Sequence, residues 1–339
     1  MKVKWKESLQ LAAVYVGSVV GAGFATGKEI VEFFSRYGTI GLIAIVLSGI
    51  FFVWFGVKIM LLALRLKATS YHQLNEHLFG KLLTPFVNLM MLIMLIGVTA
   101  VMLSGAGSVF EEQLALPRSI GIIGTIMLAL VILVIGTRGL FIVNSLIVPL
   151  LIIFCLLLFG HVLFLPDFYT NAFKPVEWQS RALLSSVSYA SFNLALTQAV
   201  LVPAAREIND TRTIKMGGVI GGIILTLLLI MNHLVVVQLP GFQLYDIPLA
   251  VMMKKMAGTV HILFLLVIYG EIFSSIIANI YGLERFIKKI LPIRTLYIGI
   301  MIFAIAFVIS SVNYSVLLAT LYPLFGNIAF VYFLLLLIK

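Results

Sequence analysis

The sequence predicts an all-α polytopic membrane protein with ten transmembrane helices in two inverted sets of five. Three observations lead to this fold class: an excess of apolar residues, ten apolar stretches of spanning length, and glycine or polar residues inside some of them. Of the 339 residues, 62% are hydrophobic and 11% are charged. A soluble domain carries about 45–50% apolar and about 25% charged residues. The surplus apolar side chains should therefore face lipid, which excludes a soluble enzyme, a secreted scaffold and a disordered chain.

A window of about 20 apolar residues, the length that crosses the hydrocarbon, identifies the ten stretches. They cover residues 8–36, 38–64, 82–109, 119–137, 139–164, 182–205, 213–238, 259–284, 293–312 and 314–338. The longest polar connectors, 65–81 and 166–181, are too short for a separate domain. Residues 1–339 are therefore expected to form one transmembrane domain. Because the apolar character resumes after Gly27, we do not expect residues 1–26 to be a cleaved signal peptide.

Lys and Arg are distributed unevenly between the two sides of the predicted bundle. With the N-terminus inside, fifteen of the 23 fall in cytoplasmic segments, six in outer segments, and Lys28 and Lys58 within spans. This positive-inside bias predicts a multi-pass protein of the cell membrane with both termini in the cytoplasm. The basic residues lie in short separated loops, so the lipid bilayer and not nucleic acid is the expected partner of the net charge of +10. Cys155 lies in an apolar run and should be a buried hydrophobe.

The connector 166–181 divides the spans into two halves, about 1–165 and 181–339. The first half enters the membrane from inside and the second from outside, so a structural repeat between them would be inverted. Inverted repeats are common in secondary transporters, which bind substrate near the membrane midplane between broken helices. Sequence identity between the halves is negligible, so this prediction depends on the number of spans and on their irregular segments.

The first irregular segment is residues 17–27 (GSVVGAGFATG), with four glycines inside one span. A continuous helix is costly there, at about 1 kcal/mol per glycine relative to alanine. Close packing through a GxxxG pattern is the alternative interpretation; it explains Gly17 and Gly21 but not Gly23 and Gly27. We therefore expect the helix to break near the middle of the membrane.

A break here would create two kinds of binding group. We expect the inner half-helix to end near Val20, where unpaired carbonyls suit a small cation. The outer half-helix would begin near Thr26, where free N–H groups at the positive end of the helix dipole suit a carboxylate. In the seventh span, by contrast, the glycines within 217–222 have no polar neighbours and predict close helix packing.

The sixth span should carry the counterpart of this break, and its residues 188–198 (SYASFNLALTQ) are unusually polar for a membrane centre. It contains no glycine, however, and Pro203 comes too late to define a central break. Hydrogen bonding between helices is the alternative interpretation for Asn193, Thr197 and Gln198.

Glu271 is the only carboxylate near the middle of a span outside the first. Ser274 and Ser275 follow three and four residues later, so all three side chains can share one helix face. Such hard oxygen donors suit sodium, and the carboxylate could instead carry a proton. The alternative is a structural hydrogen bond or an ion pair, with Lys58 and Lys28 as the available cations.

Lys28, Glu29 and Glu32 occupy the outer half of the first span. Charge inside a membrane is costly and usually functional, so we expect Lys28 and Glu29 to take part in gating or coupling. For Glu32, a solvated vestibule helix is the favoured interpretation. The apolar segment 247–253 predicts a short helix over the outer face, in the position of a lid.

No P-loop, GxSxG, HExxH or CxxC motif occurs, and no histidine has a second donor at metal-ligand spacing. We expect neither an enzyme nor a resident cofactor, and Na⁺ or H⁺ enters only as a coupling ion.

The glycine-broken first span and the paired serines of the eighth span resemble the amino acid–polyamine–organocation superfamily with the LeuT fold. Within it, residues 21–29 (GAGFATGKE) and the chain length resemble the YkvI-like bacterial membrane proteins. The resemblance implies alternating access around a central site formed by spans one, three, six and eight. It also implies a sodium site made by the carbonyls of Gly17 and Val20 and the hydroxyls of Ser274 and Ser275.

The resemblance further implies that Gly21, Ala22 and Gly23 contact a substrate carboxylate and that Phe192 gates it. Two departures matter. Phe24 replaces an asparagine found in some sodium symporters, which argues against a second sodium. Glu271 is an added charge that favours a cationic substrate or a proton.

The sequence thus predicts a cation-coupled secondary transporter of an amino acid or related small solute. The expected substrate-binding residues are Gly21, Ala22, Gly23, Thr26, Phe192, Asn193 and Glu271. Two alternatives stay open: a ligand-sensing receptor subunit with a transporter fold, and an uncoupled permease. The sequence does not predict the identity of the solute, the coupling ion or the oligomeric state.

Overall fold

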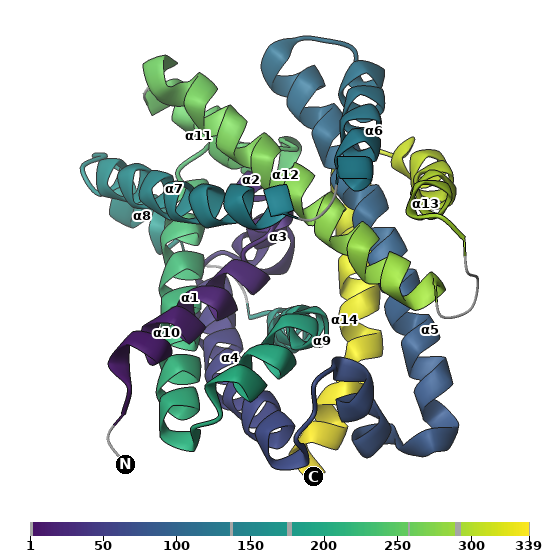
Figure 1. Cartoon of the computed structure of the whole chain (residues 1–339). Helices are drawn as coiled ribbons and strands as arrows, with labels where there is room; N and C mark the ends of the chain where they lie inside the picture. The colour runs from purple at the N-terminus through teal and green to yellow at the C-terminus, as the bar shows by residue number, and fades with distance from the viewer. Residues whose placement is uncertain (1–2, 136–137, 175–177, 257, 289–292, 339) are drawn as a thin grey trace.

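The computed structural model describes residues 3–135, 138–174, 178–256, 258–288 and 293–338, and the described chain is helical throughout (Figure 1). The α-helices are α1 (Trp5–Val19), α2 (Ala22–Thr26), α3 (Lys28–Phe33), α4 (Thr39–Leu66), α5 (Tyr71–Ser108), α6 (Arg118–Ile135), α7 (Arg138–Val162), α8 (Phe168–Ala172), α9 (Arg181–Ile208), α10 (Thr211–Val236), α11 (Pro248–Met256), α12 (Gly258–Ile287), α13 (Thr295–Ser310) and α14 (Tyr314–Ile338). The short turns η1 (Ser35–Tyr37), η2 (Val109–Gln113) and η3 (Phe242–Leu244) complete the elements.

Six of these helices are long and apolar enough to cross a membrane: α4, α5 with η2, α9, α10, α12 and α14. The described parts of α6, α7 and α13 are shorter apolar helices. Each coincides with a stretch expected from the sequence. Large apolar side chains such as Met127 and Leu157 are more than half exposed, as expected for surfaces that face lipid. The all-α class is therefore confirmed.

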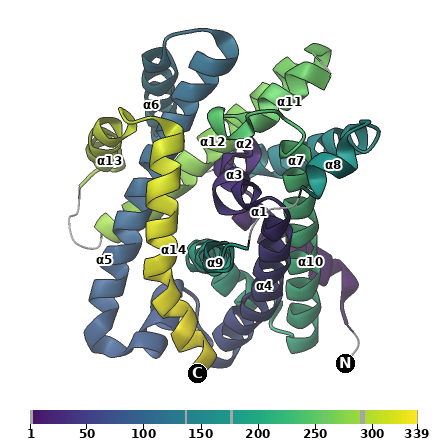
Figure 2. The same cartoon turned by 180° about the vertical axis from the view of Figure 1, so that it is seen from behind.

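The beginning of α1 and the end of α14 lie at the same end of the bundle (Figures 1 and 2). The connection from α5 to α6 and the helix α11 lie at the opposite end in both views. With the N-terminus in the cytoplasm, as the distribution of Lys and Arg predicts, the end that carries α11 is the outer end. "Inner" and "outer" are used in this sense below.

Glycines bring α10 into direct contact with α4. A Cβ placed on Gly222 would lie 2.9 Å from the backbone N and Cα atoms of Val53, and one on Gly218 would lie 2.6 Å from the Val57 side chain. On α4 itself, the absence of a side chain at Gly56 makes room for the ring of Tyr15 from α1. The Tyr15 hydroxyl donates to the Phe52 carbonyl at 2.8 Å. The packing interpretation of the glycines in the seventh span is therefore correct.

The first span is interrupted twice. Helix α1 ends at Val19, Val20 turns to an extended ψ of 103°, and Gly21 is fully extended. The five-residue helix α2 then ends at Gly27, whose φ of +81° is left-handed and favours glycine. The inner end of the break is where the sequence predicted it. The outer segment was expected to begin near Thr26. It begins at Ala22 instead, and a second turn at Gly27 divides it into α2 and α3.

The expected break in the sixth span is wrong. Helix α9 runs unbroken from Arg181 to Ile208. Its polar side chains hydrogen bond along the helix: Asn193 Nδ2 donates to the Tyr189 carbonyl at 3.1 Å, and the Thr197 hydroxyl donates to the Asn193 carbonyl. Without glycine or a central proline, the backbone has no reason to leave the helical conformation, and Pro203 is accommodated within α9.

Two local signals set element boundaries at the inner end. Gly80, with φ 76° and ψ 165°, kinks α5, so its first residues form a separate arm before the predicted third span. Asp210 caps α10, accepting hydrogen bonds from the Thr213 backbone N–H at 2.9 Å and from the Thr213 hydroxyl. These hydrogen bonds, with the hydroxyl contributing most, hold the pKa of Asp210 below its ordinary value.

Candidate functional site

The interruption between α1 and α2 lies against α12. A Cβ placed on Gly21 would lie 3.8 Å from the Ser275 hydroxyl oxygen, with nothing else within 4 Å. Gly17, Gly21 and Ser275 are each partly exposed, whereas Ser274 is buried and donates to the Glu271 carbonyl at 3.1 Å. The structure thus brings the break and the serines of α12 together. That they hold sodium stays a prediction.

Glu271 is buried beside these serines, with 4% of its surface exposed. Its Oε2 atom has no hydrogen-bond partner among the described residues. Neither expected cation pairs with it: Lys28 Nζ bonds the Gln243 carbonyl at 2.8 Å, and Lys58 Nζ bonds the Leu337 carbonyl at 3.3 Å. The ion-pair interpretation of Glu271 is therefore wrong. A buried carboxyl oxygen without a partner is suited to take a proton or to coordinate a cation.

Glu29 turns inward from α3 and is also only 4% exposed. A Cβ placed on Gly23 would lie 2.3 Å from Glu29 Oε2, so the carboxyl occupies the space that the absence of a Gly23 side chain provides. Asn193 Nδ2 of α9 approaches Glu29 Oε1 at 3.5 Å. Gly21, Ala22 and Gly23 were expected to contact a substrate carboxylate. At Gly23 the space is taken by the Glu29 carboxyl of the chain itself.

Thr26 belongs to the same cluster as Glu29. Its hydroxyl donates to the Gly23 carbonyl at 3.0 Å and lies 2.9 Å from the Tyr314 hydroxyl of α14. Phe192 faces α14, with its ring 4.5 Å from that of Tyr322. The structure therefore gathers Gly23, Thr26 and Asn193 around Glu29, and it places Phe192 at the α9–α14 contact and not over the break.

The outer end of the site is closed by the loop before α11. Lys28, 1% exposed, donates to the carbonyls of Gln243 and Tyr245 at 2.8 and 3.1 Å and lies 3.6 Å from Glu32. Leu249 of α11 packs where a side chain on Gly27 would project. The short helix over the outer face is confirmed, and Lys28 fixes the loop that leads into it.

Asp246 and Glu112 fasten the same loop to two more helices. The Asp246 carboxylate accepts hydrogen bonds from Ser108 of α5, at 2.6 Å, and from Ser315 of α14. Glu112 Oε2 accepts from the backbone N–H groups of Asp246 and Ile247 at 2.8 and 3.2 Å. Three parts of the bundle are therefore tied together above the break. These contacts could not be predicted from sequence, because the partners are far apart along the chain.

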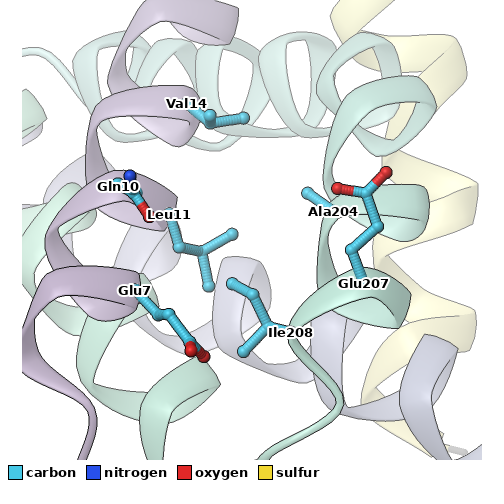
Figure 3. A pocket seen from close by; sticks show the side chains of 7 residues that line it. All are labelled: Glu7, Gln10, Leu11, Val14, Ala204, Glu207 and Ile208. Carbon is cyan, nitrogen blue, oxygen red and sulfur yellow. The ribbon is translucent and has the colours of Figure 1, made fainter.

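A cavity of about 140 Å³ lies between α1 and the end of α9 (Figure 3). Its lining residues are Glu7, Gln10, Leu11, Val14, Ala204, Glu207 and Ile208. Glu7 and Glu207 come from opposite walls, and Glu7 also pairs with Lys4 at 3.0 Å. This acidic opening at the inner end was missed from sequence, because each carboxylate by itself looks like an ordinary residue at a span end.

A larger groove of about 410 Å³ runs between α3, α9 and α14 at the outer end. Arg36 and Arg181 stand at its rim, Ser185 and Ser188 line its α9 wall, and Phe33 lies on its α3 wall. Arg36 bonds Glu32 at 2.9 Å. This groove offers the described chain a polar opening beside the Glu29 cluster.

Among the described residues, no three His, Cys, Asp or Glu side chains are placed to hold a metal ion together. The described Cys155 is buried and free, as expected.

Comparison with solved structures identifies the fold. Over 98% of its length the chain superposes on the manganese transporter of Eremococcus coleocola, in a mutant form, with a TM-score of 0.66 and 16% identity, covering 79% of that chain. The same transporter in complex with an aromatic bis-isothiourea compound gives a TM-score of 0.59 at 17% identity, with the same coverage of each chain. The chain therefore shares the fold of this membrane transporter.

No protein-family model matches the sequence. The protein YyaD of Bacillus subtilis (strain 168) is 24% identical over 330 residues, covering 95% of this chain and 94% of YyaD. The membrane protein YkvI of the same strain is 45% identical over 323 residues, which is 94% of this chain and 92% of YkvI. A multi-pass membrane protein follows from this relative and from the six long apolar helices. At this identity over nearly the full length of both sequences, the chain belongs to the YkvI family of membrane proteins.

Proposed function

We propose that this protein is a cation-coupled secondary transporter that moves a small solute by alternating access around the break between α1 and α2. The observation that carries the proposal is the buried carboxyl of Glu271, with one oxygen unpartnered, beside a break in the first span where Gly21 is partly exposed. An interrupted backbone inside a membrane is tolerated where it is buried in protein or lines a polar cavity. A buried ionisable group without a structural partner is expected to act on an ion.

The closure of the two ends supports the same proposal. The loop bound by Lys28 and Asp246 covers the outer end, whereas the cavity between α1 and α9 opens at the inner end. A transporter exposes its site to one side at a time, and this arrangement corresponds to a state closed outside and opening inside. The carboxylates of Glu7 and Glu207 would attract cations to that opening.

We further propose the ten-span arrangement of the LeuT fold, with inverted halves at about 1–165 and 181–339, in the cell membrane with cytoplasmic termini. The coupling ion is either sodium at Gly17, Val20, Ser274 and Ser275, with the Glu271 carboxylate beside it as a further oxygen donor, or a proton on Glu271. Manganese, named for the fold neighbour, is not carried over, because the described residues hold no cluster of three metal-ligating side chains.

Solid-supported-membrane electrophysiology on reconstituted protein tests the proposal. Amino acids and small amines would be applied singly, in sodium or potassium buffer and at two pH values. We expect a saturable current for at least one solute that depends on sodium or on pH. Glu271→Gln should abolish the ion dependence, whereas Glu207→Gln, which makes the same change at the inner opening, should keep it.

Three outcomes would contradict the proposal. A solute that binds in a thermal-shift assay but gives neither current nor uptake would indicate a sensor. Flux without saturation or ion dependence would indicate a permease. Ion coupling that survives in Glu271→Gln would remove the residue on which the proposal depends.

A further inference from the structure

We propose that Glu29 forms the recognition site for the ammonium group of a small organic cation, between α3, α9 and α14 and apart from the Glu271 site. This inference rests on the proposed transport function, since it names the class of solute. It explains why a carboxyl is buried on the outer side of the break, where no ion pair of the described residues satisfies it.

The side chains around Glu29 suit a positively charged ligand. The carboxyl interacts electrostatically with three buried tyrosines: Tyr189 of α9 and Tyr314 and Tyr322 of α14. Lys28, the residue before Glu29, points away from the carboxyl and bonds the outer loop. Asn193 Nδ2 approaches the carboxyl at 3.5 Å, and the Tyr189 hydroxyl faces it as a second donor. A carboxylate surrounded by aromatic faces and hydroxyl oxygens is the environment that attracts an ammonium group.

One of these groups lacks a partner. The Tyr189 hydroxyl is fully buried and has no hydrogen-bond partner within 3.5 Å in the described chain, and the polar group that it faces is the Glu29 carboxyl. A buried polar atom without a partner is costly and uncommon. An ammonium group has three donors, which Glu29, Tyr189 and one further hydroxyl oxygen could accept.

The opposite charge does not fit. A solute carboxylate placed at Gly23 would meet the Glu29 carboxyl, because Oε2 already lies within 2.3 Å of the position that a Gly23 Cβ would take. Like charges at this separation in a site of low dielectric repel strongly. Glu29 therefore disfavours solutes that are recognised through a carboxylate at this end of the break.

The groove between α3, α9 and α14 provides a route to the carboxyl. Phe33 lines the groove and also packs on Tyr189, with the ring centroids 5.1 Å apart. Ser188, next to Tyr189 in sequence, lines the same groove. The Phe33 side chain, 1% exposed, stands between the groove, of about 410 Å³, and the buried cluster, and it would have to move for a solute to pass. That volume accommodates a small amine.

Thermal unfolding of the purified protein tests this assignment with tetramethylammonium, ethylammonium and 1,4-diaminobutane as chloride salts. Potassium chloride at equal ionic strength and potassium acetate serve as controls. We expect at least one ammonium probe to raise the unfolding midpoint with saturation, and acetate not to. Glu29→Gln keeps the size and shape of the side chain. It should weaken binding of that probe by about ten- to a hundredfold, the loss expected for a hydrogen bond to a charged group.

Matched variants separate the site from its neighbours. Glu32→Gln makes the same change one turn along α3 and should bind the probe with affinity close to that of the unchanged protein. Gly23→Ala should weaken binding while retaining the acid, because its Cβ displaces the Glu29 carboxyl.

The assignment is overturned if no ammonium probe shifts the midpoint, if acetate shifts it equally, or if Glu271→Gln and not Glu29→Gln removes the effect. Binding in detergent does not require transport. Ammonium binding without current would therefore refute the transport proposal alone, and solute current without any ammonium effect would refute this site alone.

Discussion

Lys28→Met should release the loop that closes the outer end of the bundle. The methionine fills the same volume but cannot donate to the carbonyls of Gln243 and Tyr245, which accept from Lys28 Nζ at 2.8 and 3.1 Å. Helix α3 would keep its packing, so the change should act on the loop and not on the fold as a whole.

The size of the effect follows from those two hydrogen bonds. A hydrogen bond to a charged group contributes about 1.5–3 kcal/mol when buried. Gln243 is exposed and Tyr245 is half-buried, so water can replace part of what is lost. The ion pair with Glu32, at 3.6 Å, adds little. We therefore expect opening of the loop to become about 2–3 kcal/mol easier, which is about 30- to 150-fold in population at about 1.36 kcal/mol per factor of ten.

Hydrogen–deuterium exchange measures this directly, because the backbone N–H groups of Asp246 and Ile247 donate to Glu112 Oε2 and lose these bonds when the loop opens. Their exchange should accelerate by the same factor. Lys58→Met is the matched control: Lys58 also lies within a span and bonds a carbonyl, that of Leu337 at the inner end. Unchanged exchange in Lys28→Met, or equal acceleration in both variants, would refute the role given to Lys28.

Three further changes test the site and the packing. Ser274→Ala combined with Ser275→Ala should remove any sodium dependence of solute binding without unfolding the protein, and dependence that persists would exclude these hydroxyls as ligands. Gly21→Leu should abolish solute binding with helix content unchanged, because the side chain fills the partly exposed break; retained binding, measured by thermal shift, would mean that the break is not the site. Gly222→Ala should destabilise the protein by about 1–3 kcal/mol, since its Cβ meets rigid backbone of α4. Gly124→Ala, with no atom within 4 Å, should be neutral or stabilise by up to about 1 kcal/mol; similar losses in the two variants would contradict the packing argument.

The helices and the first break could be predicted from sequence because they depend on local composition. Apolar length defines the spans, and clustered glycines indicate where a helix can end. The second turn at Gly27 could not be predicted in the same way. The space beside Gly27 is filled by Leu249, more than two hundred residues away, which packs where any side chain at position 27 would project.

The error in the sixth span has a similar cause. Polar residues in a membrane helix predict either a break or hydrogen bonds, and composition does not separate the two. In α9 they bond within the helix or reach its neighbours: Asn193 to the Tyr189 carbonyl, and Ser188 to the Pro323 carbonyl. The absence of glycine was the better guide, because backbone conformation depends on it more directly than on polarity.

The carboxylates show how far sequence reasoning reaches for the site. Glu271 is conspicuous in an apolar run. That its Oε2 atom has no partner, and that Lys28 and Lys58 bond other groups, is visible only in the structure. Glu29 was expected to take part in gating or coupling, but the position of its carboxyl beside Gly23 is visible only in the structure. A charged residue inside a span can be found from sequence, whereas the direction in which its side chain points cannot.

The unbroken α9 has a mechanical consequence. Its outer half borders the groove and its inner half borders the cavity with α1, so one half cannot tilt without the other. In the outer third of α9, at the edge of the groove, Ser188 rests on Gly326 of α14, where a Cβ would meet the Ser188 hydroxyl, and α9 can pivot at this contact. If α9 tilts about this contact, one opening widens as the other narrows. Bending would then be confined to the first span, and α9 would transmit the motion between the two faces of the membrane as a rigid rod.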